Sequence, residues 1–441
     1  VKNVSNSKEL SKLIDKYLIP QELEKKKNAE VSTPYQLRKD MLDKMPEEFW
    51  REENTVFEPC CGKGGFLIDI IDRFMNGLKD KIKDKKERYK TIVEELLYWS
   101  DINPTNIFIC KLLLDPYGEY ELKYNEGDTL KLDTKKKWGI KKFDAVIGNP
   151  PYNKNLYKRF TEYLLKKCDK LLFVIPSTCT ICVSGKEFIN TLKKCGLEYL
   201  VYVSKTVWTT HIDIDTMYIL CIKEYNGNII VNDMRIGRDD NIRNYTNLHE
   251  YNIMKKLDAH KNLQLYKGRN KTLNHKSKIE TDNIKFKKSE KFCNRLLSRL
   301  NGGREEEIYY VDKYIEEEKC VKILFPRGTA SYNSHNNLVK INKDVVYSKI
   351  CWEYILLSTG IVYVKCKTIE EAKILQWYIM RSKLVRYLFI KENKFSELTK
   401  GFVMLIPKIN YNLVNEPKDE KVYKYFGLTG EEIAIIEEQF K

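Results

Sequence analysis

Four consecutive residues, Asn149-Pro150-Pro151-Tyr152, form the most distinctive chemical group of the sequence. They follow directly after residues 143–148, an apolar run that predicts a buried strand. Two consecutive prolines cannot continue a central strand, so they predict a rigid loop at its end. In such a loop the side-chain amide of Asn149 and the backbone carbonyl of Pro150 are held in set directions.

The chemistry that fits this loop is the activation of an aromatic amine, which is a poor nucleophile because its lone pair is delocalised into the ring. The Asn149 side-chain oxygen and the Pro150 carbonyl oxygen can accept its two hydrogens and favour a pyramidal nitrogen, while Tyr152 stacks on the ring. A methyl group on a positive sulfonium is already activated, so we expect no metal. The alternative, a structural proline turn with a buried tyrosine, fits the strand context less well.

A glycine-rich turn predicts where the methyl-donating cofactor binds. A short strand at residues 55–57 runs straight into residues 58–67, which read EPCCGKGGFL, and a helix is expected from residue 64. Gly62 and Gly64 let backbone amides approach a ligand without obstruction by a Cβ atom, at the sheet edge where nucleotide-like ligands bind. We expect Glu58, Gly62 and Gly64 to hold the cofactor, although such turns also serve plain packing.

Two aspartates end the next two expected strands. Asp101 closes the strand at residues 96–99, where its carboxylate could accept hydrogen bonds from both ribose hydroxyls of an adenosyl group. Asp128 ends the third strand, where it could accept a hydrogen bond from the amino group of the cofactor's adenine. Either aspartate alone would more often be a helix cap or turn residue. Their succession after the glycine-rich turn favours a site for S-adenosylmethionine.

Alternating strands and helices must position these loops. Strands are expected at 55–57, 96–99, 143–147 and 171–175, and helices at 64–74, 106–114 and 156–168. This alternation predicts an α/β fold with a doubly wound, mostly parallel sheet. It fades after about residue 225, so we expect a catalytic domain over residues 1–230 and a second domain with its own core over residues 231–441.

The composition is that of a folded protein with room for two domains. The chain has 441 residues, 42% of them hydrophobic and 32% charged, which argues against disorder. No apolar run approaches the length of a membrane span, and the first residues lack the core of a signal peptide, so we expect a cytoplasmic or nucleoid location. Cys179 and Cys182 are then expected to be buried thiols rather than a zinc or redox pair.

The formal charge of +16 is unevenly distributed. Residues 1–230 hold 39 basic and 34 acidic side chains, whereas residues 231–441 hold 39 and 28. Residues 255–299 alone carry 14 basic and 4 acidic side chains, which predicts a surface that binds a polyphosphate, with a merely solvated face as the alternative. A base inside a duplex cannot reach the loop at 149–152, so the expected partner is double-stranded DNA with the target base flipped out.

In their order, these pieces resemble the gamma class of adenine-specific DNA methyltransferases, found in restriction-modification systems, phages and large DNA viruses. Residues 29–37, AEVSTPYQL, resemble the motif that precedes the glycine-rich loop in this family. The resemblance implies that Thr33 contacts the cofactor carboxylate and that Phe66 packs on the cofactor's adenine ring. It also implies a class I S-adenosylmethionine-dependent methyltransferase fold and methyl transfer to the N6 amino group of a flipped-out adenine.

The resemblance extends more weakly to the C-terminal part. Residues 358–406 and 425–429 resemble the family's target-recognition domain, so the second domain is expected to be mixed α+β. Asp115 with Glu121 and Lys123 has roughly the spacing of a nuclease site, but it falls between two cofactor motifs and is interpreted as a loop. Any cognate restriction endonuclease is therefore expected to be a separate protein, and the methyltransferase itself a monomer.

Two alternative functions remain open at this point. The same tetrapeptide occurs in methyltransferases that act on a glutamine of release factors or on ribosomal RNA. The basic C-terminal extension argues against them, although an RNA adenine stays possible as acceptor. A non-catalytic DNA-binding relative would show an eroded tetrapeptide or a broken glycine-rich loop, and neither is seen. A metal site in residues 211–215, HIDID, is not expected.

Overall fold

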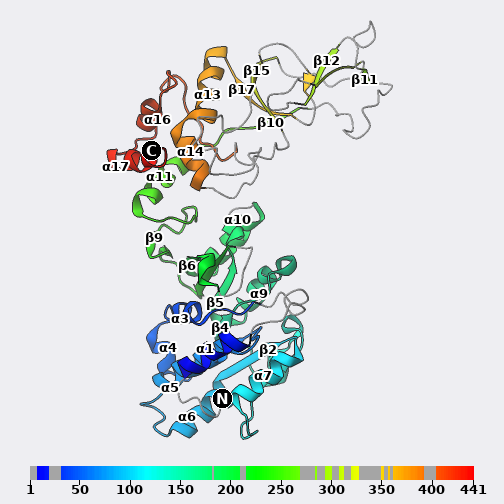
Figure 1. Ribbon diagram of the computed structural model, residues 1–441, viewed down its shortest axis with the longest axis vertical. Helices are drawn as coiled ribbons and strands as arrows, with labels where there is room; N and C mark the ends of the chain where they lie inside the picture. Colours follow the sequence, from blue (N-terminus) through cyan, green and yellow to red (C-terminus); the bar gives the residue numbers. More distant parts are fainter. Residues whose placement is uncertain are drawn as a thin grey trace. The chain divides into compact units, whose positions relative to one another are not determined.

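The computed structural model divides into two compact units, Val1–Asn244 and Tyr245–Lys441 (Figure 1). The structure describes residues 7–18, 31–180, 183–208, 215–268, 284–285, 294–299, 307–311, 319–326, 349–351, 356–357, 361–391 and 404–441. Cys182, residues 211–214, and parts of the basic stretch and of the 358–406 segment lie outside the described residues. Each unit is described by itself.

A nine-stranded sheet organises the first unit. Its strands are β1 (Val56–Glu58), β2 (Leu97–Asp101), β3 (Lys123–Glu126), β4 (Phe143–Gly148), β5 (Cys168–Pro176), β6 (Leu197–Val203), β7 (Thr216–Ile222), β8 (Ile229–Val231) and β9 (Met234–Ile236). Their order is β3-β2-β1-β4-β5-β7-β6-β8-β9. The pairs among β1 to β5 are parallel, while β7 runs antiparallel to both β5 and β6. The expected α/β fold with a mostly parallel sheet is confirmed.

Helices precede β1 and lie between the successive strands from β1 to β6. They are α1 (Ser7–Tyr17), α3 (Tyr35–Leu42), α4 (Glu47–Arg51), α5 (Gly65–Gly77), α6 (Lys85–Thr91), α7 (Pro104–Leu114), α8 (Thr134–Trp138), α9 (Leu156–Leu164) and α10 (Val183–Lys194), with a π-helical turn η1 (Ile92–Leu96) and short 3-10 turns η2 (Thr129–Lys131), η3 (Asn153–Asn155), η4 (Ser177–Thr180) and η5 (Lys205–Val207). The parallel register places the carboxyl ends of β1, β2 and β4 side by side, so the loops that follow them meet at one edge.

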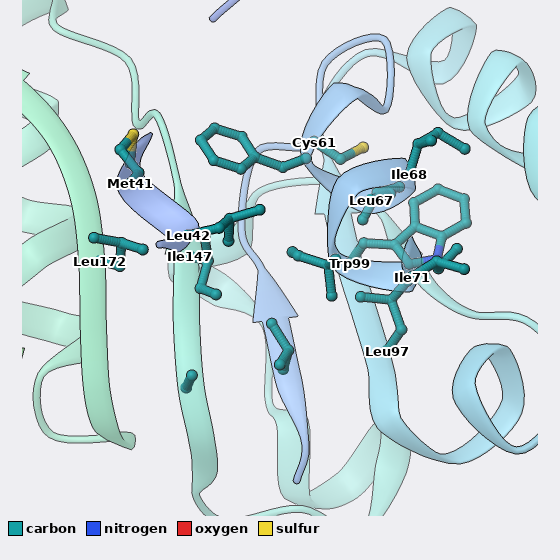
Figure 2. Close-up of a cluster of buried hydrophobic side chains, with 14 of the residues drawn as sticks. Met41, Leu42, Cys61, Leu67, Ile68, Ile71, Leu97, Trp99, Ile147 and Leu172 are labelled. Atoms are coloured by element: carbon teal, nitrogen blue, oxygen red, sulfur yellow. The ribbon is translucent and has the colours of Figure 1, made fainter. Parts of the chain in front are cut away.

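A hydrophobic core fixes the glycine-rich loop and its helix against the sheet (Figure 2). Leu67, Ile68 and Ile71 of α5 pack in the same cluster as Leu97 and Trp99 of β2. Met41 and Leu42 of α3 belong to the same cluster, as do Ile147 of β4 and Leu172 of β5. Full burial of each large apolar side chain stabilises the fold by about 1.5–3 kcal/mol, so the start of α5 is firmly anchored.

The division between the units falls later than the expected boundary at residue 230. Strand β8 pairs in parallel with β6, and the two-residue turn Asn232-Asp233 leads back into β9. Both turn residues have positive φ, 48° and 70°, as a type I′ hairpin requires. The Asn232 side chain also accepts a hydrogen bond from the Tyr202 backbone N–H at 2.9 Å. Residues 231–236 therefore complete the first unit's sheet, and polar composition alone did not reveal this pairing.

The second unit contains both helices and sheets. One four-stranded sheet has the order β10 (Tyr266–Lys267), β17 (Ile361–Cys366), β14 (Val321–Pro326) and β15 (Lys349–Cys351), and another has β11 (Ile284–Lys285), β13 (Glu307–Val311), β12 (Asn294–Arg299) and β16 (Leu356–Leu357). The helices are α11 (Leu248–Asp258), α13 (Ile369–Arg381), α14 (Lys383–Lys391), α16 (Asp419–Tyr425) and α17 (Gly430–Glu438). Among the described residues of both units, no helix is long and apolar enough to cross a membrane.

Candidate active site

A cavity of about 460 Å³ lies in the first unit, at the edge of the sheet where β1, β2 and β4 end. Such a volume is in the range of about 300–1,000 Å³ that small-molecule sites occupy. Nine of the ten residues expected to act in the site line it: Thr33, Glu58, Gly62, Phe66, Asp101, Asp128, Asn149, Pro150 and Tyr152. These residues come from five separate stretches of the chain, so the fold gathers what the sequence disperses.

Gly64 is the expected site residue that does not line the cavity. It is the N-cap of α5 with φ 84°, in the left-handed region that glycine tolerates best. A Cβ atom at this position would lie 3.1 Å from the Cys110 sulfur. Gly64 therefore shapes the turn into α5 and lets α7 approach it closely.

The glycine-rich loop is tied to the end of β2. The backbone N–H of Gly62 donates to Asp101 Oδ2 at 2.9 Å, and the backbone N–H of Asn103 donates to Oδ1 at 2.8 Å. Burial raises the pKa of the Asp101 carboxyl, and these backbone donors lower it. Asp101 thus holds the loop in place and lines the cavity at the same time.

Asp128 is both the cap of a turn and a residue of the cavity wall, the two interpretations that the sequence left open. Its carboxylate caps the short turn η2 by accepting a hydrogen bond from the Leu130 backbone N–H at 3.0 Å. It also lines the cavity, with 38% of its side chain exposed. The neighbouring Thr129 is buried and donates to the Pro59 carbonyl at 2.6 Å, which joins this turn to the glycine-rich loop.

Glu58, the last residue of β1, places a carboxyl group inside the cavity wall. Its side chain is 1% exposed, and among the described residues its Oε2 atom has no hydrogen-bond partner. Burial raises the pKa of this carboxyl well above its ordinary value, while the positive charge of Arg38 lowers it. A buried acceptor without a partner is costly unless a ligand donates to it, so Glu58 fits a cationic or hydrogen-bond-donating ligand.

The Asn149 side chain has one end occupied and one end open. Its Nδ2 atom donates to Thr33 Oγ1 at 3.1 Å and to the Val31 carbonyl at 3.4 Å. Its Oδ1 atom is buried and has no partner among the described residues. Cys60 donates its thiol hydrogen to the Asn149 backbone carbonyl, with sulfur and oxygen 3.2 Å apart. The site therefore presents a bare amide oxygen on a firmly held loop.

Tyr152 completes the loop. Its ring meets that of Tyr157 edge to face, with centroids 6.2 Å apart, and its hydroxyl is buried without a partner among the described residues. Burial raises the pKa of this hydroxyl, so the ring stays neutral. A neutral aromatic ring beside an amide acceptor can hold a flat, amine-bearing ring.

The first part of the chain matches a known protein family. The model of the family described as N-6 DNA Methylase matches residues 14–174, a range that contains every residue of the cavity discussed above. Residues 14–174, a little over a third of the chain, are therefore similar to this family. The adenine-specific DNA methyltransferase predicted from the sequence thus has an independent basis in this segment.

Solved structures similar to the chain include three restriction-modification proteins. A modification subunit of a putative type I restriction enzyme from Vibrio vulnificus YJ016 is 15% identical, with 58% of this chain and 59% of that one covered and a TM-score of 0.39. The type I restriction enzyme EcoKI M protein is 17% identical, with 42% of this chain and 47% of that one covered and a TM-score of 0.34. The type IIG restriction endonuclease BpuSI is 12% identical, with 98% of this chain and 67% of that one covered and a TM-score of 0.41. The chain spans about half to three fifths of the two type I proteins, and no curated protein matches it.

Two further residues of the N-6 DNA methylase segment were missed in the sequence. Ile102 follows Asp101, lines the cavity and is 63% exposed, so it offers an apolar surface to a ligand. Arg38 is 2% exposed and forms ion pairs with Asp15 at 2.8 Å and Asp69 at 2.6 Å. An isoleucine directly after a strand-end aspartate could have been recognised from the sequence as part of the cavity wall. The ion pairs of Arg38 could not, because its partners lie far from it in sequence.

Proposed function

We propose that the whole chain is a site-specific DNA adenine methyltransferase that transfers a methyl group from S-adenosylmethionine to the N6 amino group of a flipped-out adenine. The observation that carries the proposal is the buried Oδ1 atom of Asn149, which lies in a cavity at the strand ends and has no hydrogen-bond partner among the residues that the structure describes. A buried acceptor left open in this way suits an amine that arrives with the substrate.

The residues around the cavity fit S-adenosylmethionine. The Glu58 Oε2 atom, which has no partner within the described part of the chain, is a suitable acceptor for the cofactor's ammonium group. Asp101 and Asp128 can accept from the cofactor's ribose hydroxyls and adenine amine. Phe66 and the exposed Ile102 provide apolar surface for the adenine ring. When bound, the cofactor supplies an activated methyl group on a positive sulfur.

The chain's own residues prepare the acceptor amine. Asn149 Oδ1 and the Pro150 carbonyl accept its two hydrogens, which favours a lone pair that points out of the ring plane. Tyr152 stacks on the base and restricts its rotation. Because these contacts improve as the amine becomes pyramidal, they stabilise the transition state more than the ground state.

The rest of the chain is assigned to DNA binding. The excess of basic over acidic side chains in residues 231–441 supports contact with phosphates, and we assign to this part the recognition of the target site. A monomeric enzyme and a cognate restriction endonuclease encoded as a separate protein belong to the same proposal. Flipping the target base out of the duplex costs a few kcal/mol, roughly, and the phosphate contacts must offset this free energy.

The test is single-turnover transfer of labelled methyl from S-adenosylmethionine to three acceptors offered in parallel: mixed duplex DNA, structured RNA and a protein extract. We expect label only in DNA, and only as N6-methyladenine after digestion. Label in RNA or in protein glutamine would contradict the DNA assignment while keeping the amine chemistry. Absence of transfer to all three would leave only a DNA-binding relative.

A further inference from the structure

The neighbours of the Asn149 amide are chemically unequal. The Val31 carbonyl can only accept a hydrogen bond, so the atom that faces it at 3.4 Å must be the amide nitrogen. The same nitrogen donates to the Thr33 hydroxyl oxygen at 3.1 Å. Both groups belong to the segment that precedes α3. The Val31 carbonyl selects one of the two amide orientations, and the Thr33 hydroxyl, which can donate as well as accept, adds a second hydrogen bond to that orientation.

The orientation matters because the amide ends have opposite hydrogen-bonding roles. The terminal torsion of asparagine has two broad preferred orientations, which exchange the oxygen and the nitrogen. With the oxygen toward the cavity, the side chain accepts from an amine. With the nitrogen toward the cavity, donors would face donors and the amine could not be held.

We propose that Thr33 is a positioning residue whose hydroxyl, together with the Val31 carbonyl, keeps the Asn149 amide oxygen turned toward the target amine. This inference rests on the proposed function and goes beyond the expected contact of Thr33 with the cofactor carboxylate. Since the hydroxyl oxygen accepts from Asn149, its hydrogen remains free to donate to another group. Contact with the cofactor and orientation of Asn149 are therefore compatible roles.

The segment that carries these two acceptors is itself held from two helices. Arg38 donates to the Thr33 carbonyl and pairs with Asp15 of α1 and Asp69 of α5. Gly65 makes room for it, since a Cβ atom there would lie 2.7 Å from the guanidinium. Thr33 is 6% exposed, so its hydroxyl is fixed in a buried place. Because removal of Arg38 would leave buried carboxylates unpaired, the sharper test is at Thr33.

The test compares Thr33→Val, Thr33→Ser and Thr161→Val in the full chain. Thr161 is a matched control because it is buried outside the cavity wall and its hydroxyl donates to the Tyr157 carbonyl of its own helix at 2.7 Å. Each variant is measured for cofactor affinity by calorimetry, for melting temperature, and for the single-turnover methylation rate at saturating cofactor and DNA.

We expect Thr33→Val to lower the single-turnover rate at least about tenfold with cofactor affinity changed less than the rate. Thr33→Ser retains the hydroxyl and should stay near the wild-type rate, as should Thr161→Val. In an Asn149→Ala background, Thr33→Val should cause no further loss, because both residues act through one amide. Additive losses, or a change in cofactor affinity without a change in rate, would overturn the proposal.

The outcomes separate this inference from the proposed function. If the wild-type chain methylates DNA adenine and Thr33→Val does so equally fast, only the positioning role is wrong. If the wild-type chain methylates RNA or protein instead, the assigned substrate is wrong, and the same variants measured on that acceptor decide the positioning role. If Thr33→Ser loses the rate as severely as Thr33→Val, the hydroxyl is not the element that matters and the proposal fails.

Discussion

Among single residues, Glu58 lies in an environment that is unfavourable to its charge. Its carboxyl is 1% exposed, Oε2 has no partner among the described residues, and burial raises its pKa well above the ordinary value. Asn149 has a comparable open acceptor in Oδ1. Two buried acceptors in one cavity that lack partners among the described residues are stability costs that bound ligands would remove. Predictions at this scale therefore concern those two residues.

Glu58→Gln should weaken binding of S-adenosylmethionine at least about tenfold, because a charge-assisted hydrogen bond to the ammonium group is replaced by a neutral one. The isosteric change keeps the packing of β1. Titration calorimetry at neutral pH measures the effect. Asp144→Asn is a suitable control, since this carboxylate accepts from Thr55 at 2.7 Å away from the cavity, and an equal loss in both variants would contradict the prediction.

The raised pKa of Glu58 also predicts how stability changes with pH. The folded chain keeps the proton where the unfolded chain has lost it, so this contribution is fully present below the ordinary value of 4.5 and is lost as pH rises through the raised pKa. The Glu58→Gln variant has no carboxyl that titrates at this position, so it does not lose stability in this way as the pH rises. Without cofactor, its melting temperature should match the wild type at low pH and exceed it increasingly toward pH 8. A constant difference across this range would refute the expectation.

Asn149→Ala should lower the methylation rate by two or more orders of magnitude and leave cofactor affinity near normal. The change deletes an acceptor that acts on the amine in the transition state and removes little from the cofactor's surroundings. Single-turnover kinetics measures the methylation rate, and calorimetry on the same preparation measures the cofactor affinity. An active Asn149→Ala enzyme would refute the mechanism.

Among the elements, the turn between β1 and α5 depends on left-handed backbone conformations that glycine tolerates best. Gly62 and Gly64 have φ of 51° and 84°. The loop between them is held at one end by Asp101, through the Gly62 N–H, and at the other by the packed start of α5. The geometry of the cavity wall is therefore set by helix packing and by the end of β2, and a change in this turn should alter stability and cofactor binding together.

Gly64→Ala should destabilise the first unit by more than the 1–2 kcal/mol, roughly, that a left-handed alanine costs alone. The added Cβ would lie 3.1 Å from the sulfur of Cys110 in α7, a contact tight enough that this side chain would have to shift by a few tenths of an ångström. Gly118→Ala is the matched control, because Gly118 has φ 72° and open space around it. Thermal unfolding and calorimetry should show a larger loss of stability for Gly64→Ala, and weaker cofactor binding in that variant alone. Equal effects would show that backbone strain, not packing, dominates.

At the scale of the whole molecule, chemistry and charge are distributed differently between the two units. The residues around the cavity all belong to the first unit, whereas most of the basic excess lies in the second unit, whose residues 245–441 hold 36 basic and 25 acidic side chains. The second unit has helices and sheets with their own buried side chains, such as Leu324 and Tyr363. A division between a catalytic unit and a DNA-binding unit is consistent with this distribution and remains a proposal.

Salt should separate the two binding functions. DNA affinity of the full chain should fall linearly on logarithmic axes as salt rises, with a slope of about −0.9 for each phosphate contact, because bound counterions are released. Cofactor affinity should change little, since its contacts are few and partly buried. Fluorescence anisotropy with labelled duplex and calorimetry with cofactor give the two dependences. A flat dependence for DNA would contradict the proposed phosphate-binding surface.

The sequence by itself determined the parts that depend on local chemistry. Two prolines after an apolar strand, glycines between a strand and a helix, and aspartates at strand ends are short-range patterns with few structural solutions, so the sheet and the loops at its edge could be predicted from them. The boundaries of the four strands predicted at residues 55–57, 96–99, 143–147 and 171–175 were close to those observed, because these strands are largely buried.

Tertiary structure alone decided which of these residues meet and in what state. Asn149 and Thr33 are 116 residues apart, and their hydrogen bond exists only because the segment before α3 crosses the end of β4. The burial that raises the pKa of Glu58, the pairing of Arg38 with two distant aspartates, and the addition of β8 and β9 to the sheet also depend on long-range packing. Such contacts leave no local pattern, since any buried donor and acceptor of suitable size would satisfy them.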